Sequence, residues 1–165
     1  MNIYTLLCLS AMAILSHSLS ANEYIKDNDH IKSLSEAGIR EDIESLTIDD
    51  CDKLKDLNDI KNYKKLKSLT IKDMKLKDLN FLPDGSDITY LDLSDSENIS
   101  DWSGILRLTK LETLIINDCD LEKIPEEIFK LENIKKLDMR DNDDIRRYSI
   151  EELKKAKPNT KIISD

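Results

Sequence analysis

The chain has 165 residues and a formal net charge of −9, from 25 Lys and Arg against 34 Asp and Glu. This length is enough for one domain with its own core, so the fold does not depend on a metal or a disulfide framework. The acidic balance argues against non-specific nucleic-acid binding, which needs a cationic face to release counterions from phosphates. It favours a basic or mixed-charge protein partner.

Residues 1–20 are predicted to be a secretory signal peptide. They contain no Asp, Glu, Lys or Arg, and an apolar run extends from Ile3 to Leu15. That run is shorter than the about 20 residues needed to cross a bilayer. Ser18 and Ser20 are small residues that suit cleavage before Ala21. We therefore expect a secreted, extracellular protein with no membrane span after cleavage; an uncleaved anchor is the alternative.

Residues 21–42 are predicted to form a helical N-terminal cap. The apolar residues of this segment recur with a helical spacing, and Ser33 and Glu36 have the spacing of a capping box. Gly38 is typical of the residue that ends a helix. Such a cap would cover the open end of the segment that follows.

Five copies of an apolar pattern occupy residues 43–148 at a nearly constant interval, with starts at positions 43, 66, 88, 111 and 134. Each copy has three apolar residues at its first, fourth and sixth positions: Ile43/Leu46/Ile48, Leu66/Leu69/Ile71, Ile88/Leu91/Leu93, Leu111/Leu114/Ile116 and Ile134/Leu137/Met139. Alternate residues of a strand point to opposite faces. The pattern therefore predicts a short strand in every copy, with its apolar side turned inward.

The fourth copy, Leu111-x-x-Leu114-x-Ile116-x-x-Cys119-x-Leu121, resembles the signature of the leucine-rich repeat family, L-x-x-L-x-L-x-x-(N/C)-x-L. The resemblance implies an α/β solenoid of about five repeats, a slab with a short parallel β-sheet on its concave face. It also implies that the protein binds another protein through that face. Residues 149–165 are predicted to add a C-terminal cap helix, starting at the capping box Ser149-x-x-Glu152 and stopped by Pro158, and then an edge strand.

One residue of each repeat corresponds to the Asn/Cys position of the family signature: Cys51, Met74, Ser96, Cys119 and Asn142. In the family this side chain points into the turn and satisfies backbone groups, which Met74 cannot do. Cys51 and Cys119 lie three repeats apart, or about 14 Å at the strand spacing of a sheet, which is too far for a disulfide. Both are predicted to be buried free thiols.

The residue before this position is always an aspartate, which gives an acidic ladder of Asp50, Asp73, Asp95, Asp118 and Asp141. Neighbouring carboxylates repel, so the ladder needs an explanation. Three remain open: hydrogen bonds from backbone N–H groups of the turn, a stripe that receives Lys or Arg of a partner, and a calcium-binding edge.

The outward-pointing residues of the predicted strands become larger and more charged in the later repeats. The candidate partner-binding residues are Tyr90, Asp92, Ile115, Asn117, Lys136, Asp138 and Arg140. Ile115 is the most informative, because an apolar side chain is least expected at an exposed strand position. An ordinary solvated sheet face is the alternative. Trp102 is predicted to pack in the core, and Asn98-Ile99-Ser100 matches a glycosylation acceptor that matters only in a eukaryotic secretory route.

Nothing in the sequence indicates catalysis. Its two histidines, His17 and His30, cannot form a triad or a His-based metal cluster, and its three glycines are scattered. We therefore predict a secreted, monomeric, non-enzymatic module that binds a protein and needs no cofactor or metal, with an effector or adhesin as one version. The alternatives are a binder of calcium or a cationic ligand through the acidic ladder, and a repeat protein that inhibits an enzyme.

Overall fold

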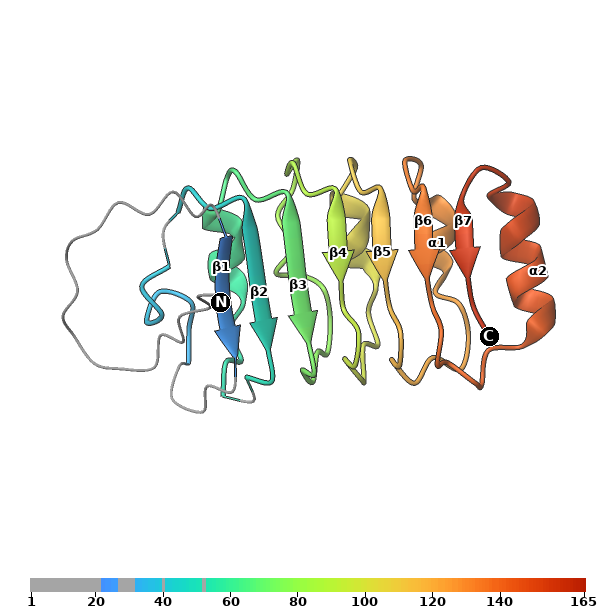
Figure 1. Ribbon diagram of the computed structural model, residues 1–165, viewed down its shortest axis with the longest axis horizontal. Helices are drawn as coiled ribbons and strands as arrows, with labels where there is room; N and C mark the ends of the chain where they lie inside the picture. Colours follow the sequence, from blue (N-terminus) through green and yellow to red (C-terminus); the bar gives the residue numbers. More distant parts are fainter. Residues whose placement is uncertain (1–21, 27–31, 40, 52) are drawn as a thin grey trace, which may run out of the picture.

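The computed structural model describes residues 22–26, 32–39, 41–51 and 53–165, so the predicted signal peptide lies outside the described residues. Its main feature is a parallel sheet of seven strands, arranged in the order in which they occur in the chain. Figure 1 shows these strands side by side in one row. They are β1 (Asn22–Lys26), β2 (Ser45–Asp49), β3 (Ser68–Lys72), β4 (Tyr90–Asp92), β5 (Thr113–Ile115), β6 (Lys136–Asp138) and β7 (Lys161–Ile163).

The segments that connect the strands return along one side of the sheet and contain its short helices (Figure 1). These are the 3-10 helices η1 (Asn58–Asn62) and η2 (Ser103–Arg107) and the α-helices α1 (Glu126–Lys130) and α2 (Arg147–Ala156). In the described part of the chain, no helix has the length and apolar character needed to cross a membrane. One strand and one return per repeat make a solenoid slab, as the sequence predicted.

The core lies between the sheet and the return segments, and it is built from equivalent residues of successive repeats. The leucine at the second position of each strand from β2 to β6 is fully buried: Leu46, Leu69, Leu91, Leu114 and Leu137 are each 0 % exposed. Burial of such a side chain contributes about 1.5–3 kcal/mol. Each leucine is covered by neighbouring repeats, so the repeats stabilise one another.

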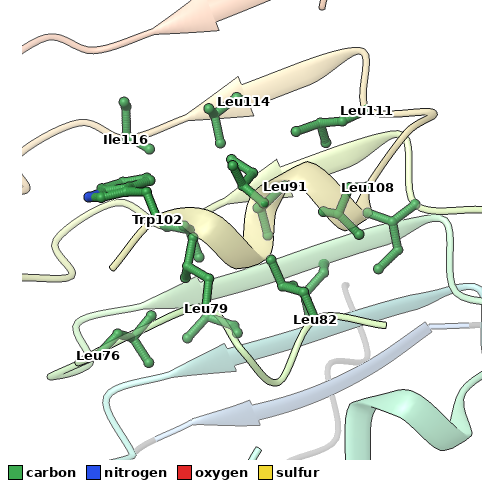
Figure 2. Close-up of a cluster of buried hydrophobic side chains, with 14 of the residues drawn as sticks. Leu76, Leu79, Leu82, Leu91, Trp102, Leu108, Leu111, Leu114 and Ile116 are labelled. Atoms are coloured by element: carbon green, nitrogen blue, oxygen red, sulfur yellow. The ribbon is translucent and has the colours of Figure 1, made fainter. Parts of the chain in front are cut away.

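Trp102 belongs to this core, as predicted. Figure 2 shows its ring among Leu79, Leu91 and Ile116, which come from three different repeats. The side chain is 5 % exposed, and the indole Nε1 donates a hydrogen bond to the carbonyl of Ile99 at 3.1 Å. The ring therefore packs in the interior of the slab and does not form part of its surface.

The register of the strands confirms the predicted columns. Ser45 lies opposite Ser68, and the same column continues through Tyr90 and Thr113 to Lys136. The triplets that begin at positions 43, 66, 88, 111 and 134 therefore align side by side. Residues on the face of the sheet opposite the return segments can be compared rung by rung, and we call this the open face.

The helical cap predicted for residues 21–42 is wrong where the structure describes this segment. Asn22–Lys26 is strand β1, paired in parallel with β2, and residues 34–38 form a turn. The capping-box contacts exist: the Glu36 N–H donates to Ser33 Oγ at 3.4 Å, and the Lys32 N–H donates to Glu36 Oε2 at 2.9 Å. They close a single turn, which ends at Gly38 with a φ of +69°.

The physical reason is that this segment is itself a repeat, because Asn22 pairs with Ser45, one repeat length further along the chain. Ser33 forms a parallel bridge with Asp56, which lies one repeat length further along the chain. Leu34, which is 0 % exposed, precedes the buried Leu57 by the same interval. Packing of an equivalent repeat against β2 therefore outweighs the local helical pattern.

After the last repeat the chain forms a helix and then a strand, the order that the sequence predicted. Helix α2 begins at Arg147, so Ser149 lies inside its first turn and does not cap it; the capping position is Arg146, which makes no side-chain capping bond. The helix ends at Ala156, shortly before Pro158. Strand β7 then pairs with β6 and extends the sheet.

Candidate functional site

The Asn/Cys column links each repeat to the one before it. Except for Met74, its side chains reach the backbone carbonyl of an inward-pointing residue in the preceding repeat. The distances are 3.9 Å from Cys51 Sγ to Ile25, 3.2 Å from Ser96 Oγ to Ile71, 3.2 Å from Cys119 Sγ to Leu93, and 2.9 Å from Asn142 Nδ2 to Ile116. The predicted inward orientation of these residues is therefore confirmed.

Both Cys51 and Cys119 are buried thiols that form no disulfide, as predicted. Burial raises the pKa of the Cys119 thiol to about 12, so the thiol stays protonated at neutral pH. A protonated, buried thiol is a poor nucleophile and a poor metal ligand. Its role is to fill space and to donate a weak hydrogen bond.

The backbone conformation explains why an aspartate occupies each position of the acidic ladder. This explanation differs from the hydrogen bonds with turn N–H groups that the sequence suggested. Its five residues have positive φ values of 51°, 50°, 58°, 50° and 58° for Asp50, Asp73, Asp95, Asp118 and Asp141. Asp and Asn adopt this left-handed conformation more readily than other non-glycine residues. The backbone N–H of Asp118 still continues the sheet by donating to the carbonyl of Arg140 at 3.0 Å. The turn geometry thus accounts for the choice of Asp in every repeat.

Electrostatic repulsion between the carboxylates of the ladder remains unfavourable. Burial raises the pKa of Asp95, and neighbouring Asp118 adds to this effect. In the described part of the chain, no group of three or more His, Cys, Asp or Glu side chains is arranged to hold a metal ion. The calcium alternative therefore gains no support from the geometry.

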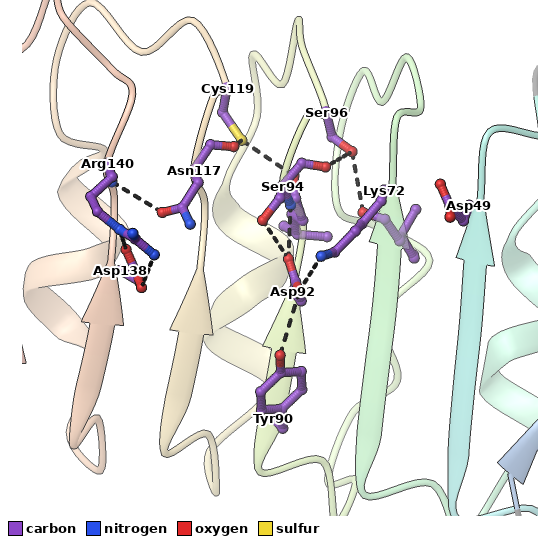
Figure 3. A network of polar contacts seen from close by, with 12 residues as sticks. Asp49, Lys72, Tyr90, Asp92, Ser94, Ser96, Asn117, Cys119, Asp138 and Arg140 are labelled. Carbon is purple, nitrogen blue, oxygen red and sulfur yellow. Dashed lines mark hydrogen bonds and ion pairs between the residues drawn. The ribbon is translucent and has the colours of Figure 1, made fainter. Parts of the chain in front are cut away.

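On the open face, Asp92 of β4 lies where the sequence placed it, but its carboxylate is occupied. The side chain is 4 % exposed in spite of its outward direction. Figure 3 shows it accepting hydrogen bonds from Ser94 N–H at 3.0 Å, Ser94 Oγ at 2.6 Å and the Tyr90 hydroxyl at 3.4 Å, with Lys72 Nζ at 3.1 Å. Burial and the nearby Asp92 charge raise the pKa of Tyr90. Asp92 therefore positions its neighbours.

Asp138 of β6 has the same character. Its Oδ1 and Oδ2 accept hydrogen bonds from Arg140 Nε at 2.8 Å and Nη2 at 3.0 Å (Figure 3). The Lys136 Nζ lies at 3.8 Å from Oδ2. The hydrogen bonds from Arg140 hold the pKa of Asp138 below its ordinary value, so the buried carboxylate stays charged. Arg140 is also fixed through its backbone N–H, which donates to Asn117 Oδ1 at 3.0 Å.

Ile115 lies between these two acids, since its register partners are Asp92 on one side and Asp138 on the other. It is half-buried, as are Tyr90, Asn117 and Lys136, while Arg140 is exposed. The structure therefore brings the predicted residues together on β4, β5 and β6 and on the residues that directly follow β5 and β6. Two of them, Asp92 and Asp138, lie below the accessible surface.

Strands β1 and β7 extend the open face beyond the residues that the sequence singled out. Tyr24, 53 % exposed, lies opposite Thr47, and its hydroxyl donates to Asp49 at 3.0 Å. At the other end, Lys161 lies opposite Lys136 and Ile163 opposite Asp138. The signal for β1 was present in the sequence, because Tyr24-Ile25 precedes Thr47-Ile48 by one repeat length.

One hollow in the described part of the chain lies away from this face. It has a volume of about 620 Å³, at the turn edge between the first two repeats. Its lining includes Cys51 and Met74, with Lys55, Lys75 and Lys77. None of the residues that line this hollow is one of the predicted contact residues.

Comparison with known proteins shows the fold. No protein-family model matches the sequence, and no curated protein matches it. Among solved structures, a leucine-rich repeat protein of Leptospira interrogans is similar with a TM-score of 0.56 and 22% sequence identity, over 73% of this chain and 31% of that chain. At this identity the likeness concerns the fold alone. Together with the strand order and the register, it shows that this chain has the leucine-rich repeat fold.

Proposed function

We propose that this protein is a secreted, non-enzymatic module that binds a protein partner through the open face of its sheet. Secretion rests on the signal-like character of residues 1–20. Binding rests mainly on one observation, which is that Tyr90, Ile115 and Arg140 present aromatic, apolar and cationic groups on neighbouring repeats. These residue types are enriched where protein interfaces carry most of their energy.

Rigidity supports the same proposal. The face is a hydrogen-bonded sheet, and each of its two buried acids, Asp92 and Asp138, holds the side chain two residues further along the chain through a short contact. Groups that are fixed before binding lose less conformational entropy when a partner docks. The surface is therefore suited to a partner of defined shape.

The test is capture by chemical cross-linking from culture medium or host extract, followed by mass spectrometry. The face variant combines Tyr90→Ser, Ile115→Thr and Lys136→Ser, which are the residues found at the same positions in earlier repeats. It leaves the Arg140–Asp138 pair intact and should fold. A control variant, Leu106→Lys with Phe129→Lys, changes two exposed residues on the return side.

We expect the native protein and the control to capture the same partner, and the face variant to lose it. The loss of one aromatic and one aliphatic contact should weaken affinity by about tenfold or more. Equal capture by the native protein and the face variant would contradict the proposal. Thermal melts of all three proteins establish that each is folded.

A further inference from the structure

The N-terminal half of the open face differs in composition from the half that carries the predicted contact residues. On β2 and β3 its outward side chains are small and hydroxylated. They form two pairs of register partners, Ser45 with Ser68 and Thr47 with Thr70. All four side chains are half-buried, and we call the area that they form the hydroxyl floor.

The hydroxyl groups of this floor are available to a ligand. Among the side-chain hydrogen bonds of the described residues, none involves one of the four. In the next repeat, by contrast, Ser94 Oγ donates to Asp92 at 2.6 Å and Ser96 Oγ donates to the carbonyl of Ile71 at 3.2 Å. A hydroxyl group has one donor and two acceptor lone pairs. The floor therefore offers both donors and acceptors to the same ligand.

The charged groups around the floor are balanced. Six charged residues border it, and they form three ion pairs: Lys26–Asp49 at 3.0 Å, Lys67–Glu44 at 3.1 Å and Lys72–Asp92 at 3.1 Å. A cationic ligand meets rim carboxylates that are already paired. Beyond this rim the acidic ladder begins, which disfavours an anionic ligand further. The electrostatics of the area therefore favour a ligand without charge.

A tyrosine lies on each side of the floor. Tyr24 of β1 is the register partner of Thr47, and Tyr90 of β4 is the register partner of Ser68. Each hydroxyl group donates to a rim carboxylate, that of Tyr24 at 3.0 Å and that of Tyr90 at 3.4 Å, the second of which is drawn in Figure 3. These bonds restrain the rings before a ligand arrives, which lowers the entropy cost of binding.

The two tyrosines set the length of the area. Strands β1 and β4 are separated by β2 and β3, and three strand spacings amount to about 14 Å. The floor lies between the two rings. An elongated ligand therefore contacts both rings and the hydroxyl groups at once.

We propose that this platform, formed by Tyr24, Tyr90 and the hydroxyl floor, binds a neutral oligosaccharide. A sugar ring has hydroxyl groups at its edge, which exchange hydrogen bonds with serine and threonine. It also has an apolar face of C–H groups, which stacks on the apolar body of a tyrosine ring. A short chain of such rings is elongated and carries no charge, as the platform requires.

The composition of the floor argues against a protein ligand at the same place. Serine is depleted at protein interfaces, and serine and threonine are under-represented among the residues that dominate their binding energy. The inference goes beyond the proposed function, because it assigns a second kind of ligand to β1–β3, whereas the protein partner is placed on the later repeats. Tyr90 borders both areas and is therefore left unchanged in the test.

The test is an array of immobilised oligosaccharides probed with the purified secreted protein. It contains neutral cello-, chito-, malto- and manno-oligosaccharides beside sulfated and uronic-acid oligosaccharides. The floor variant is Thr47→Val with Thr70→Val, which removes two hydroxyl groups and keeps β-branched residues in the strands. The matched control is Thr113→Val, which makes the same kind of change on β5, on the far side of Tyr90.

We expect the protein to bind neutral oligosaccharides in preference to charged ones. Titration calorimetry with a bound oligosaccharide then compares the variants. Each lost hydrogen bond weakens binding by roughly twofold to tenfold, so the floor variant should bind about tenfold or more weakly, and the control should stay within about twofold. Tyr24→Ala should weaken binding to a similar extent, whereas Tyr24→Phe keeps the ring and should retain most of the affinity.

Three results overturn the inference. They are equal affinity of the native protein and the floor variant, stronger binding of sulfated or uronic-acid oligosaccharides than of neutral ones, and no binding to any neutral oligosaccharide of the array. Thermal melts establish that every variant is folded. A captured protein partner without oligosaccharide binding would reject this inference alone, and oligosaccharide binding without a captured protein would reject the proposed function alone.

Discussion

Asn142 and Cys119 occupy the same position in consecutive repeats, and the Asn142 side chain links them. Its Oδ1 accepts the backbone N–H of Cys119 at 3.2 Å and that of Leu121 at 3.1 Å. Its Nδ2 donates to the carbonyls of Ile116 at 2.9 Å and Met139 at 3.1 Å. One amide thus satisfies backbone groups of two turns, which neither a thiol nor a thioether can do.

Asn142→Ala should therefore be strongly destabilising. It leaves buried N–H and C=O groups without partners, each of which costs about 1–3 kcal/mol, so we expect a loss of about 3 kcal/mol or more in the free energy of unfolding. Urea denaturation followed by circular dichroism measures it. The control is Asn133→Ala, which removes one exposed hydrogen bond to Thr109 and should cost less than about 1 kcal/mol. Similar losses in the two variants would contradict this role.

The acidic ladder should be tolerant of Asn and intolerant of Ala. Asp118 has a φ of 50°, so Asp118→Ala should cost about 1–2 kcal/mol through left-handed strain. Asp118→Asn keeps the tolerance for this conformation and removes a like charge near Asp95, so its stability should equal or exceed that of the native protein. Thermal melts of both variants test this. A melting temperature that rises with millimolar calcium in the native protein but not in Asp118→Asn would instead assign the ladder to a metal.

The Arg140–Asp138 pair predicts a pH-dependent effect. The pKa of Asp138 is lowered in the folded protein by its hydrogen bonds from Arg140. Such a carboxyl contributes stability that is present above its unfolded pKa of about 3.9 and is lost as the pH falls through the folded pKa. Arg140→Met should therefore destabilise the protein at pH 7, and the difference from the native protein should shrink below about pH 4.

Denaturation curves of both proteins between pH 3 and pH 7 measure this difference. Lys154→Met is the control, because Lys154 forms an exposed pair with Glu151 at 3.5 Å, and such pairs contribute little. A difference between Arg140→Met and the native protein that stays constant over this range would show that Arg140 acts through packing alone.

The repeats and the columns of the sheet could be predicted from the sequence because each depends on local periodicity. Leu46, Leu69 and Leu91 each have polar neighbours in their strand, and they recur at a nearly constant interval along the chain. In a parallel solenoid, only one strand register places all three side by side. Strand β1 was missed because Glu23 occupies the position of the buried Leu46. This charged residue interrupts the apolar pattern, so the first repeat was not recognised, although the interval between it and the next repeat is the usual one.

The outward position of the candidate site residues was also predictable, but their accessibility was not. Asp92 and Asp138 point away from the core, so the sequence pattern placed them on the surface. Their burial comes from Ser94 and Arg140, two residues further along, whose side chains fold back onto the carboxylates. Period-two alternation describes which face a residue occupies, but it carries no information on contacts between neighbours on that face.

Thiol reactivity should report the burial of the cysteines. Both Cys51 and Cys119 are buried, and the raised pKa of Cys119 keeps its thiol protonated. In the protein without residues 1–20, Ellman's reagent should therefore react slowly with the folded chain and rapidly with both thiols in denaturant. Rapid reaction without denaturant would show that these turns open, and a failure to react in denaturant would indicate a disulfide.

Gly104 tests how closely the second and third repeats approach each other on the return side. A Cβ atom at this position would lie 2.0 Å from the carbonyl oxygen of Leu79. Because that atom belongs to the backbone, Gly104→Ala must push the two repeats apart, and we expect a loss of about 2–4 kcal/mol, at the upper end of the costs of overpacking. Gly85→Ala is the control: it has open space but a φ of +61°, so it should cost only about 1 kcal/mol through strain. A larger loss at Gly85 than at Gly104 would show that backbone conformation, and not the close contact between repeats, sets the requirement for glycine.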